Sequence, residues 1–185
     1  KSRILTEGAP SGKIAMGITP LQREGPKIPN WSFPIRENPN EGEFRYLRMA
    51  WKKKGGGSIM VELASNGSWP DAKVAKGRYV AGPNTTGWAS LSVSEKAPNE
   101  WTVVTMDLWK DLGDFTLTGI APTCDRGEEA FFDSIILGPS VASLDGYRVE
   151  KYPVALVASS NAPKKNIGNA FTDPENPIRK IFKGE

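Results

Sequence analysis

The chain contains no histidine and only one cysteine among its 185 residues. Without histidine it cannot assemble a Ser-His-Asp or Cys-His catalytic group, a histidine-ligated zinc site or a histidine-ligated haem. The single cysteine, Cys124, cannot form a disulfide within the chain or a zinc site built from thiolates. These absences exclude several large classes of hydrolases and redox proteins.

Long apolar runs and phosphate-binding motifs are also missing. No apolar stretch approaches the ~18 residues of a transmembrane helix, so we expect no membrane-spanning segment. Neither a Walker-type loop nor a GxGxxG after a strand occurs. The 24 Lys and Arg are interleaved with 21 Asp and Glu, which leaves a net charge of +3. Nucleic-acid binding usually needs a basic stripe beside aromatic stacking platforms, so we expect no nucleic-acid partner.

Short segments with strand character fill most of the chain. Leu47, Met49 and Trp51 share one face of a period-two pattern, which is typical of a strand. Gly55–Gly57 separates two such patterns and predicts a β-hairpin. The strands that we predict span residues 13–19, 43–53, 58–64, 78–81, 90–94, 101–108, 115–123 and 130–137. They predict an all-β fold, an antiparallel two-sheet β-sandwich.

The composition changes after about Tyr147. Residues 148–185 are rich in Lys, Asn and Pro and contain only one short apolar run. We therefore predict a β-sandwich domain over residues 1–147 and an extended C-terminal arm or linker over residues 148–185.

Acidic side chains are the remaining candidates for catalysis, because a pair of carboxylates is enough for a glycosidase or a lyase. No pattern places two of them across a cleft, so we expect a protein that is not an enzyme. The acidic candidates are Glu62, Asp107, Asp111, Asp114, Glu128, Glu129 and Asp133.

Asp133 lies inside an otherwise apolar strand pattern, residues 131–137. A carboxylate buried there costs free energy unless it is paired or bound to a cation. Two interpretations stay open: a satisfied side chain at the edge of a sheet, or a ligand of a structural Ca²⁺ ion. In the second, Glu7, Ser11 and Lys13 of the loop before the first strand supply the other oxygens.

Several tryptophans lie in segments with loop composition. Trp88 and Asn84 share the loop of residues 83–88, and Trp69 and Trp31 lie in two other loops. An exposed indole can stack on the apolar face of a sugar while nearby amides bind its hydroxyls. The alternative is that these rings fold back onto the core.

Basic residues accompany the predicted strands. If Arg48 and Arg78, with Arg45 and Lys53, share a concave face, they can hold an acidic or sulfated glycan. The alternative is an ordinary solvated face.

Three long segments resemble a domain of large secreted proteins from planctomycete-type bacteria, which often also carry c-type cytochrome domains. They are residues 43–64 (EFRYLRMAWKKKGGGSIMVELA), residues 78–123 and residues 130–138 (AFFDSIILG). The last residues, 173–185, resemble the segment that leads into the next domain of such proteins. The resemblance implies a secreted or periplasmic protein. The chain has no CxxCH motif, so no haem is expected within these residues.

More broadly, WTVVTMDL (101–108), FTLTGI (115–120) and FDSIILG (132–138) are similar to galactose-binding-like jelly rolls, which include many carbohydrate-binding modules. The resemblance implies a jelly-roll sandwich, a structural Ca²⁺ at Asp133 beside the turn of residues 10–13, and a polysaccharide or other glycan as ligand. The alternative function is a structural or interaction domain that contacts neighbouring domains or subunits of a larger secreted, cytochrome-associated protein. A fragment of a polysaccharide lyase or hydrolase is a third, weaker hypothesis.

Overall fold

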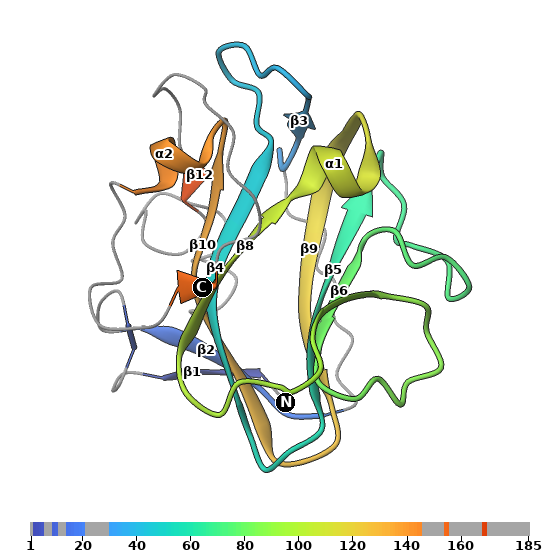
Figure 1. Ribbon diagram of the computed structural model, residues 1–185, viewed down its shortest axis with the longest axis vertical. Helices are drawn as coiled ribbons and strands as arrows, with labels where there is room; N and C mark the ends of the chain where they lie inside the picture. Colours follow the sequence, from blue (N-terminus) through green and yellow to red (C-terminus); the bar gives the residue numbers. More distant parts are fainter. Residues whose placement is uncertain are drawn as a thin grey trace.

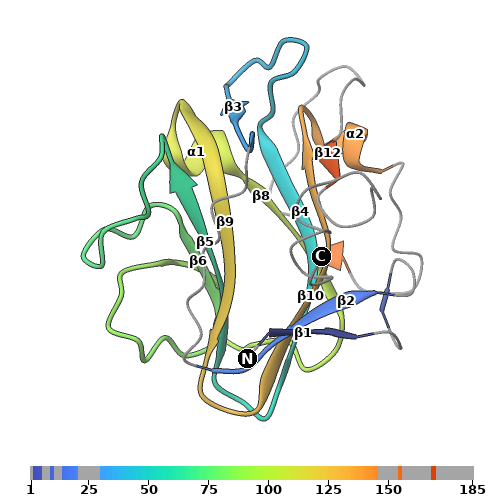
Figure 2. The ribbon, with the colours of Figure 1, turned by 180° about the vertical axis from the view of Figure 1, so that it is seen from behind.

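The computed structural model describes residues 2–5, 9–10, 14–20, 30–145, 154–155 and 168–169. Two β-sheets face each other across the interior (Figures 1 and 2). Sheet A has seven strands in the order β1-β2-β10-β4-β8-β11, with β12 paired to β10, and sheet B has five in the order β3-β9-β5-β6-β7. The predicted all-β two-sheet sandwich is therefore confirmed.

The strands of both sheets are short to medium in length. Sheet A contains β1 (Ser2–Leu5), β2 (Ala15–Ile18), β4 (Tyr46–Lys54), β8 (Thr102–Asp107), β10 (Glu129–Gly138), β11 (Val154–Ala155) and β12 (Gly168–Asn169). Sheet B contains β3 (Phe33–Ile35), β5 (Ser58–Ser65), β6 (Arg78–Ala81), β7 (Leu91–Ser94) and β9 (Phe115–Asp125). The helices are α1 (Leu108–Leu112) and α2 (Val141–Leu144). Neighbouring strands are antiparallel, except for the parallel pairs β6–β7 and β8–β11.

The inner faces follow the predicted period of two. Leu47, Met49 and Trp51 of β4 are buried together in the main core. Trp51 meets Phe132 of β10 edge to face, with ring centroids 6.5 Å apart. The same core contains Ile59, Val61 and Leu63 of the opposite sheet. Alternate residues of both sheets thus form one apolar interior.

The outer faces are buried as well, and they carry polar groups. Arg48, Thr105 and Asp133 are buried on sheet A, and Glu62 and Arg78 are buried on sheet B. The outer face of a sheet is usually exposed to water, and its side chains are usually polar for that reason. Here each buried polar group needs a hydrogen-bonding partner inside the protein. For Arg78 these partners include backbone carbonyls of the loops that flank β6.

The predicted hairpin at Gly55–Gly57 is wrong. The chain does reverse there, but β4 belongs to sheet A and β5 to sheet B. Both edges of β4 are already taken, by β10 and β8, and both edges of β5 are taken by β9 and β6. The turn therefore crosses between the sheets, at the lower end of the sandwich in Figure 1.

At that end three chain reversals meet through their backbones. A Cβ atom added to Gly57 or Gly127 would collide with the backbone of the neighbouring turn, and one added to Gly82 would lie 2.6 Å from the Gly57 carbonyl oxygen. All three glycines also have positive φ. Glycine is thus required both by the local backbone and by the close approach.

Two short strands lie in the arm predicted from residue 148 onwards. β11 pairs with β8, and β12 pairs with β10. The described part of the arm therefore adds to sheet A. None of the helices in the described ranges is long and apolar enough to cross a membrane.

Candidate functional site

Two loops cover the outer face of sheet B. The Trp69 loop, residues 66–77, joins β5 to β6, and the Trp88 loop, residues 82–90, joins β6 to β7. Both lie on the side of the sheet away from β4 and β8 (Figures 1 and 2). The loops are joined by a backbone hydrogen bond from the Ala89 N–H to the Ala72 carbonyl, 2.8 Å long. They form one surface because of this bond and because of the arginine beneath them.

Arg78 ties both loops to the sheet. Its guanidinium is fully buried, and Nε donates to Oε2 of Glu62 at 3.1 Å. The remaining donors reach backbone carbonyls of both loops: Pro70 at 2.6 Å, Asp71 at 2.9 Å, Val74 at 3.3 Å and Ala89 at 3.1 Å. A planar guanidinium is suited to this role because its N–H groups point in fixed, divergent directions.

Glu62 supplies the opposite charge for this buried arginine. Both side chains have 0% exposure, and the two residues are register partners on β5 and β6. Removing one member of a buried ion pair leaves the other charge without compensation, typically at a cost of about 3–5 kcal/mol. The pair therefore links the stability of sheet B to the shape of the loops above it.

Trp88 lies on the same guanidinium. The Arg78 Cζ atom is 5.2 Å from the centroid of the indole ring. Arg78 is inaccessible to solvent whereas Trp88 is only half-buried. This loop tryptophan is therefore neither a fully buried core residue nor a freely solvated one. Contact with the cation restrains the ring.

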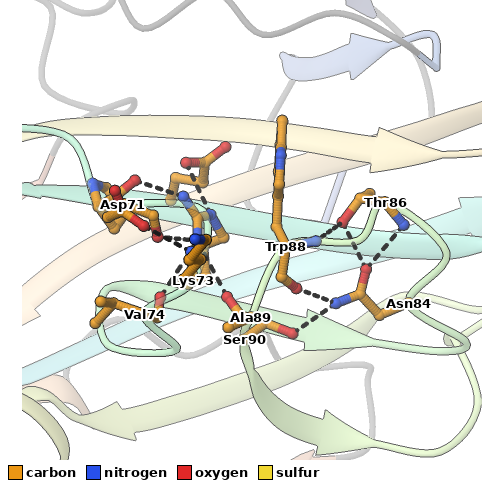
Figure 3. Close-up of polar contacts among 11 residues, drawn as sticks. Asp71, Lys73, Val74, Asn84, Thr86, Trp88, Ala89 and Ser90 are labelled. Atoms are coloured by element: carbon orange, nitrogen blue, oxygen red, sulfur yellow. Dashed lines mark hydrogen bonds and ion pairs between the residues drawn. The ribbon is translucent and has the colours of Figure 1, made fainter.

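Asn84 determines the shape of the Trp88 loop. Its Nδ2 donates to the Trp88 carbonyl at 2.6 Å and to Ser90 Oγ at 2.9 Å. Its Oδ1 accepts from the backbone N–H and the hydroxyl of Thr86 at 3.1 and 2.7 Å. Figure 3 shows Trp88 between these contacts and the group around Asp71, Lys73 and Val74. The amide closes the loop around the indole, as asparagine commonly does in turns.

The tip of the Trp88 loop is also attached to sheet B. The Thr85 hydroxyl donates to Oδ2 of Asp125, at the end of β9. Thr85 and Thr86 were not among the residues predicted to contact a ligand. The signal was present in the unbroken polar run Asn84-Thr85-Thr86, where each side chain can bond to nearby backbone.

Trp69 lies on the same outer face, over β9. A Cβ atom placed on Gly119 would come 3.2 Å from Cη2 and 3.3 Å from Cζ2 of this indole. The ring is half-buried, and the missing side chain at position 119 leaves room for it. Trp69, Asn84 and Trp88 therefore lie on the same outer face of sheet B, above the buried Arg78.

The other predicted ligand residues lie elsewhere. Trp31 is 8% exposed, packs with Phe33 at 5.1 Å between ring centroids, and is part of the main core. Arg48 is 7% exposed on the outer face of sheet A, where it donates to the Thr105 hydroxyl at 3.0 Å and lies 3.4 Å from Asp145. The structure does not bring these two residues to the Trp88 surface.

Asp133 is 1% exposed on the outer face of sheet A, at an irregularity in the pairing of β10 with β4. Its Oδ1 accepts the backbone N–H of Ser134 at 2.7 Å. Ser134 has a φ of 52°, and its buried hydroxyl lacks a hydrogen-bond partner within the described ranges. A buried carboxylate beside a strained residue with an unpartnered hydroxyl is what supports the expectation of a hard cation here.

The other oxygens proposed for this cation come from Glu7, Ser11 and Lys13, which lie outside the described residues. Among residues that are described, no group of three or more His, Cys, Asp or Glu side chains could hold a metal ion. Of the four residues predicted as Ca²⁺ ligands, Asp133 alone lies within the described part of the chain.

A second stacked pair lies at the opposite end of the sandwich from the glycine turns. Arg45 lies 5.0 Å from the ring of Trp109, and its guanidinium forms an ion pair with Asp107 at 2.7 Å. That hydrogen bond raises the pKa of Arg45. Trp109 Nε1 donates to Asp114 at 2.8 Å. Asp107 is thus paired with Arg45, and Asp114 accepts a hydrogen bond from Trp109. Such pairing is typical of acidic residues with a structural role.

Comparisons with protein families, with curated proteins and with solved structures give no significant match.

Proposed function

We propose that this β-sandwich, of jelly-roll and galactose-binding-like type, is a non-catalytic carbohydrate-binding domain whose glycan contacts the Trp88 surface. The observation that carries the proposal is the half-buried indole of Trp88, held 5.2 Å from a fully buried guanidinium. A tryptophan restrained in this way loses little conformational entropy when a ligand stacks on it.

The chemistry of the loop suits a sugar. The apolar C–H face of a pyranose can cover the accessible part of an indole, and its hydroxyls need hydrogen-bonding groups around the ring. The hydroxyls of Thr85, Thr86 and Ser90 each take part in holding the Trp88 loop, and each keeps an acceptor lone pair that a sugar hydroxyl can use. Trp69, on the same face, is the second aromatic candidate.

The basic residues act indirectly in this proposal. Arg78 lies under Trp88 with its donors bound to Glu62 and to loop carbonyls, so it positions the indole without contacting the glycan. Arg48 and Trp31 lie elsewhere in the sandwich and serve its packing.

We also propose a structural Ca²⁺ ion at Asp133 and a secreted or periplasmic location. The buried carboxylate beside the strained Ser134 supports the ion. The location rests on the resemblance in sequence to secreted domains.

The decisive experiment compares two tryptophans that each stack on an arginine. A glycan array identifies a ligand, and affinity electrophoresis then measures wild type, Trp88→Ala and Trp109→Ala. Loss of the Trp88 ring should weaken binding at least about tenfold, or about 1.4 kcal/mol. Trp109, stacked on Arg45 at the end of the sandwich, is the matched control and should leave binding unchanged.

Thermal unfolding separates loss of contact from loss of fold, and Trp88→Phe, which keeps a smaller ring, should bind with intermediate strength. Equal effects of the Trp88 and Trp109 variants would refute the site. If no glycan binds and the protein instead associates with a neighbouring domain of a larger protein, the structural or interaction role replaces this proposal.

A further inference from the structure

The Trp88 surface has almost no charge to offer a ligand. The Trp88 loop, residues 82–90, contains no Asp, Glu, Lys or Arg. Arg78, the cation that stacks on the Trp88 ring, has 0% exposure and is paired with Glu62, also at 0%. The guanidinium and the carboxylate cancel each other beneath the ring, so the indole lies over a pair that is neutral overall.

The charges around this centre are of mixed sign. The Trp69 loop carries Asp71, Lys73 and Lys76, and Asp125 binds the tip of the Trp88 loop through Thr85. Asp71, Lys73 and Lys76 are exposed. Exposed charges are screened over about 8 Å at physiological ionic strength. Charges of both signs, Asp71 and Asp125 against Lys73, Lys76 and the exposed Arg126, therefore lie around the rim, and screening leaves only a weak field to select an anion or a cation.

The buried guanidinium also acts against a cationic ligand. A cation on the accessible side of the indole would share the ring with the Arg78 charge on the other side, and like charges separated by one ring repel each other. An anion would gain little in return, because the donors of Arg78 are already occupied by Glu62 and by backbone carbonyls. A carboxylate or sulfate would lose hydration without a charged partner.

Uncharged polar groups are what the surface does offer. The hydroxyls of Thr85, Thr86 and Ser90 lie in the same loop as the Trp88 indole, and each keeps an acceptor lone pair beyond its bonds within the protein. Stacking and neutral hydrogen bonds recognise the faces and hydroxyls of a neutral sugar. We infer that the Trp88 surface selects uncharged glycans and discriminates against sulfated, uronic and amino sugars. This inference rests on the proposed function, and it names the ligand class of that same surface.

Matched polysaccharide pairs test this selectivity. Affinity electrophoresis is run in gels that contain hydroxyethylcellulose or carboxymethylcellulose, desulfated or native carrageenan, and N-acetylated or deacetylated chitosan. The neutral member of at least one pair should retain the protein at least fivefold more strongly than its charged counterpart. Raising NaCl from 20 to 500 mM should change this retention less than twofold, because no ion pairs form.

Two lysine variants serve as controls outside the proposed contacts. Lys73→Ala and Lys76→Ala should leave retention by the neutral polymer within twofold of wild type, whereas Trp88→Ala should abolish it. Stronger retention by charged polymers, reversed by salt and lost in Lys73→Ala, would overturn the selectivity while leaving a glycan-binding domain. Absence of retention by every polymer, together with a blank glycan array, would overturn both conclusions.

Discussion

Two buried arginines, one on each sheet, show how differently the same side chain can be used. Arg78 on sheet B pairs with a fully buried glutamate at 3.1 Å and reaches carbonyls in two loops. Arg48 on sheet A donates to one hydroxyl, and its ion-pair partner Asp145 lies 3.4 Å away with a side chain that is 63% exposed. Arg78 therefore holds two loops in place on sheet B, whereas Arg48 only packs against the outer face of sheet A.

The two arginines differ because their acidic partners lie in different places. Glu62 is the register partner of Arg78 in the adjacent strand, so the pair forms as soon as β5 and β6 align. Asp145 follows the short helix α2, and its charge is shared with water. A buried carboxylate provides strong, directional pairing, whereas an exposed one contributes little.

The largest expected effect is the loss of Arg78. Arg78→Ala leaves Glu62 buried without its cation and frees four loop carbonyls, so we expect a loss of about 3–5 kcal/mol in the free energy of unfolding. Arg48→Ala should cost about 1–2 kcal/mol, because it removes one hydroxyl contact and a long, exposed ion pair. Urea denaturation measures both variants.

Arg78→Lys sharpens this comparison. Lysine keeps the charge but cannot reach several carbonyls at once, so the variant should regain part of the stability while the fluorescence of Trp88 still differs from that of wild type. Similar losses for Arg78→Ala and Arg48→Ala would show that the two arginines are equivalent and that the loops do not depend on Arg78.

A cation at Asp133 would extend the contrast between the sheets. The buried carboxylate of sheet A would then be neutralised by an ion from solution, whereas Glu62 of sheet B is neutralised by Arg78. At a Ca²⁺ concentration about 100-fold above Kd, binding contributes about 2.7 kcal/mol. EGTA should therefore lower Tm by about 5–10 °C in a protein of this size.

Asp133→Asn keeps an acceptor for the Ser134 N–H but removes the charge, so its Tm should not respond to EGTA. A wild-type Tm that is the same with Ca²⁺ and with EGTA would rule out the ion and would leave Asp133 as a satisfied side chain.

Lys53 is a third kind of buried cation, and the smallest change in stability that we expect concerns this residue. It is 2% exposed, its ammonium donates to the Lys54 carbonyl at 2.9 Å, and burial lowers its pKa. Between this lowered pKa and the ordinary value of about 10.4, the unfolded chain binds more protons than the folded one. Stability from this residue should therefore rise with pH across that window and be weakest below it.

Lys53→Met removes this dependence. As the pH increases from 7 to 10, the free energy of unfolding of wild type should rise relative to that of Lys53→Met. The slope of this rise should be at most about 1.4 kcal/mol per pH unit. Urea denaturation at several pH values measures the slope. A difference that stays constant with pH would show that Lys53 is solvated like a surface lysine.

The strand pattern was largely predictable, because side-chain alternation and β-branched residues are local signals. Residues 101–108 predict β8, and 78–81 predict the bounds of β6. The crossing at Gly55–Gly57 was not predictable, because a turn looks the same whether it joins neighbours in one sheet or strands of two sheets. That choice depends on which strand edges are occupied, a property of the whole fold.

The candidate site was predictable only in part. Trp88, Asn84 and Trp69 were recognisable as loop residues, and Arg78 as a basic residue on a strand. The burial of Arg78 depends on Glu62, sixteen residues earlier in the chain, and on carbonyls whose positions have no sequence signature. Arg48 looked equivalent in sequence but lies on the opposite sheet, so a shared residue type did not indicate a shared location.

The glycine turns at the lower end of the sandwich have a practical consequence for protein engineering. Gly57, Gly127 and Gly82 bring backbone against backbone, so a reporter peptide or new chain termini inserted there would prise the two sheets apart. Gly42, in contrast, has open space around its missing side chain and precedes β4. Gly42 itself has a positive φ of 81°, so fluorophores and immobilisation tags are better attached at the exposed Glu41 beside it, where they leave both the sheet junction and the indole surface accessible.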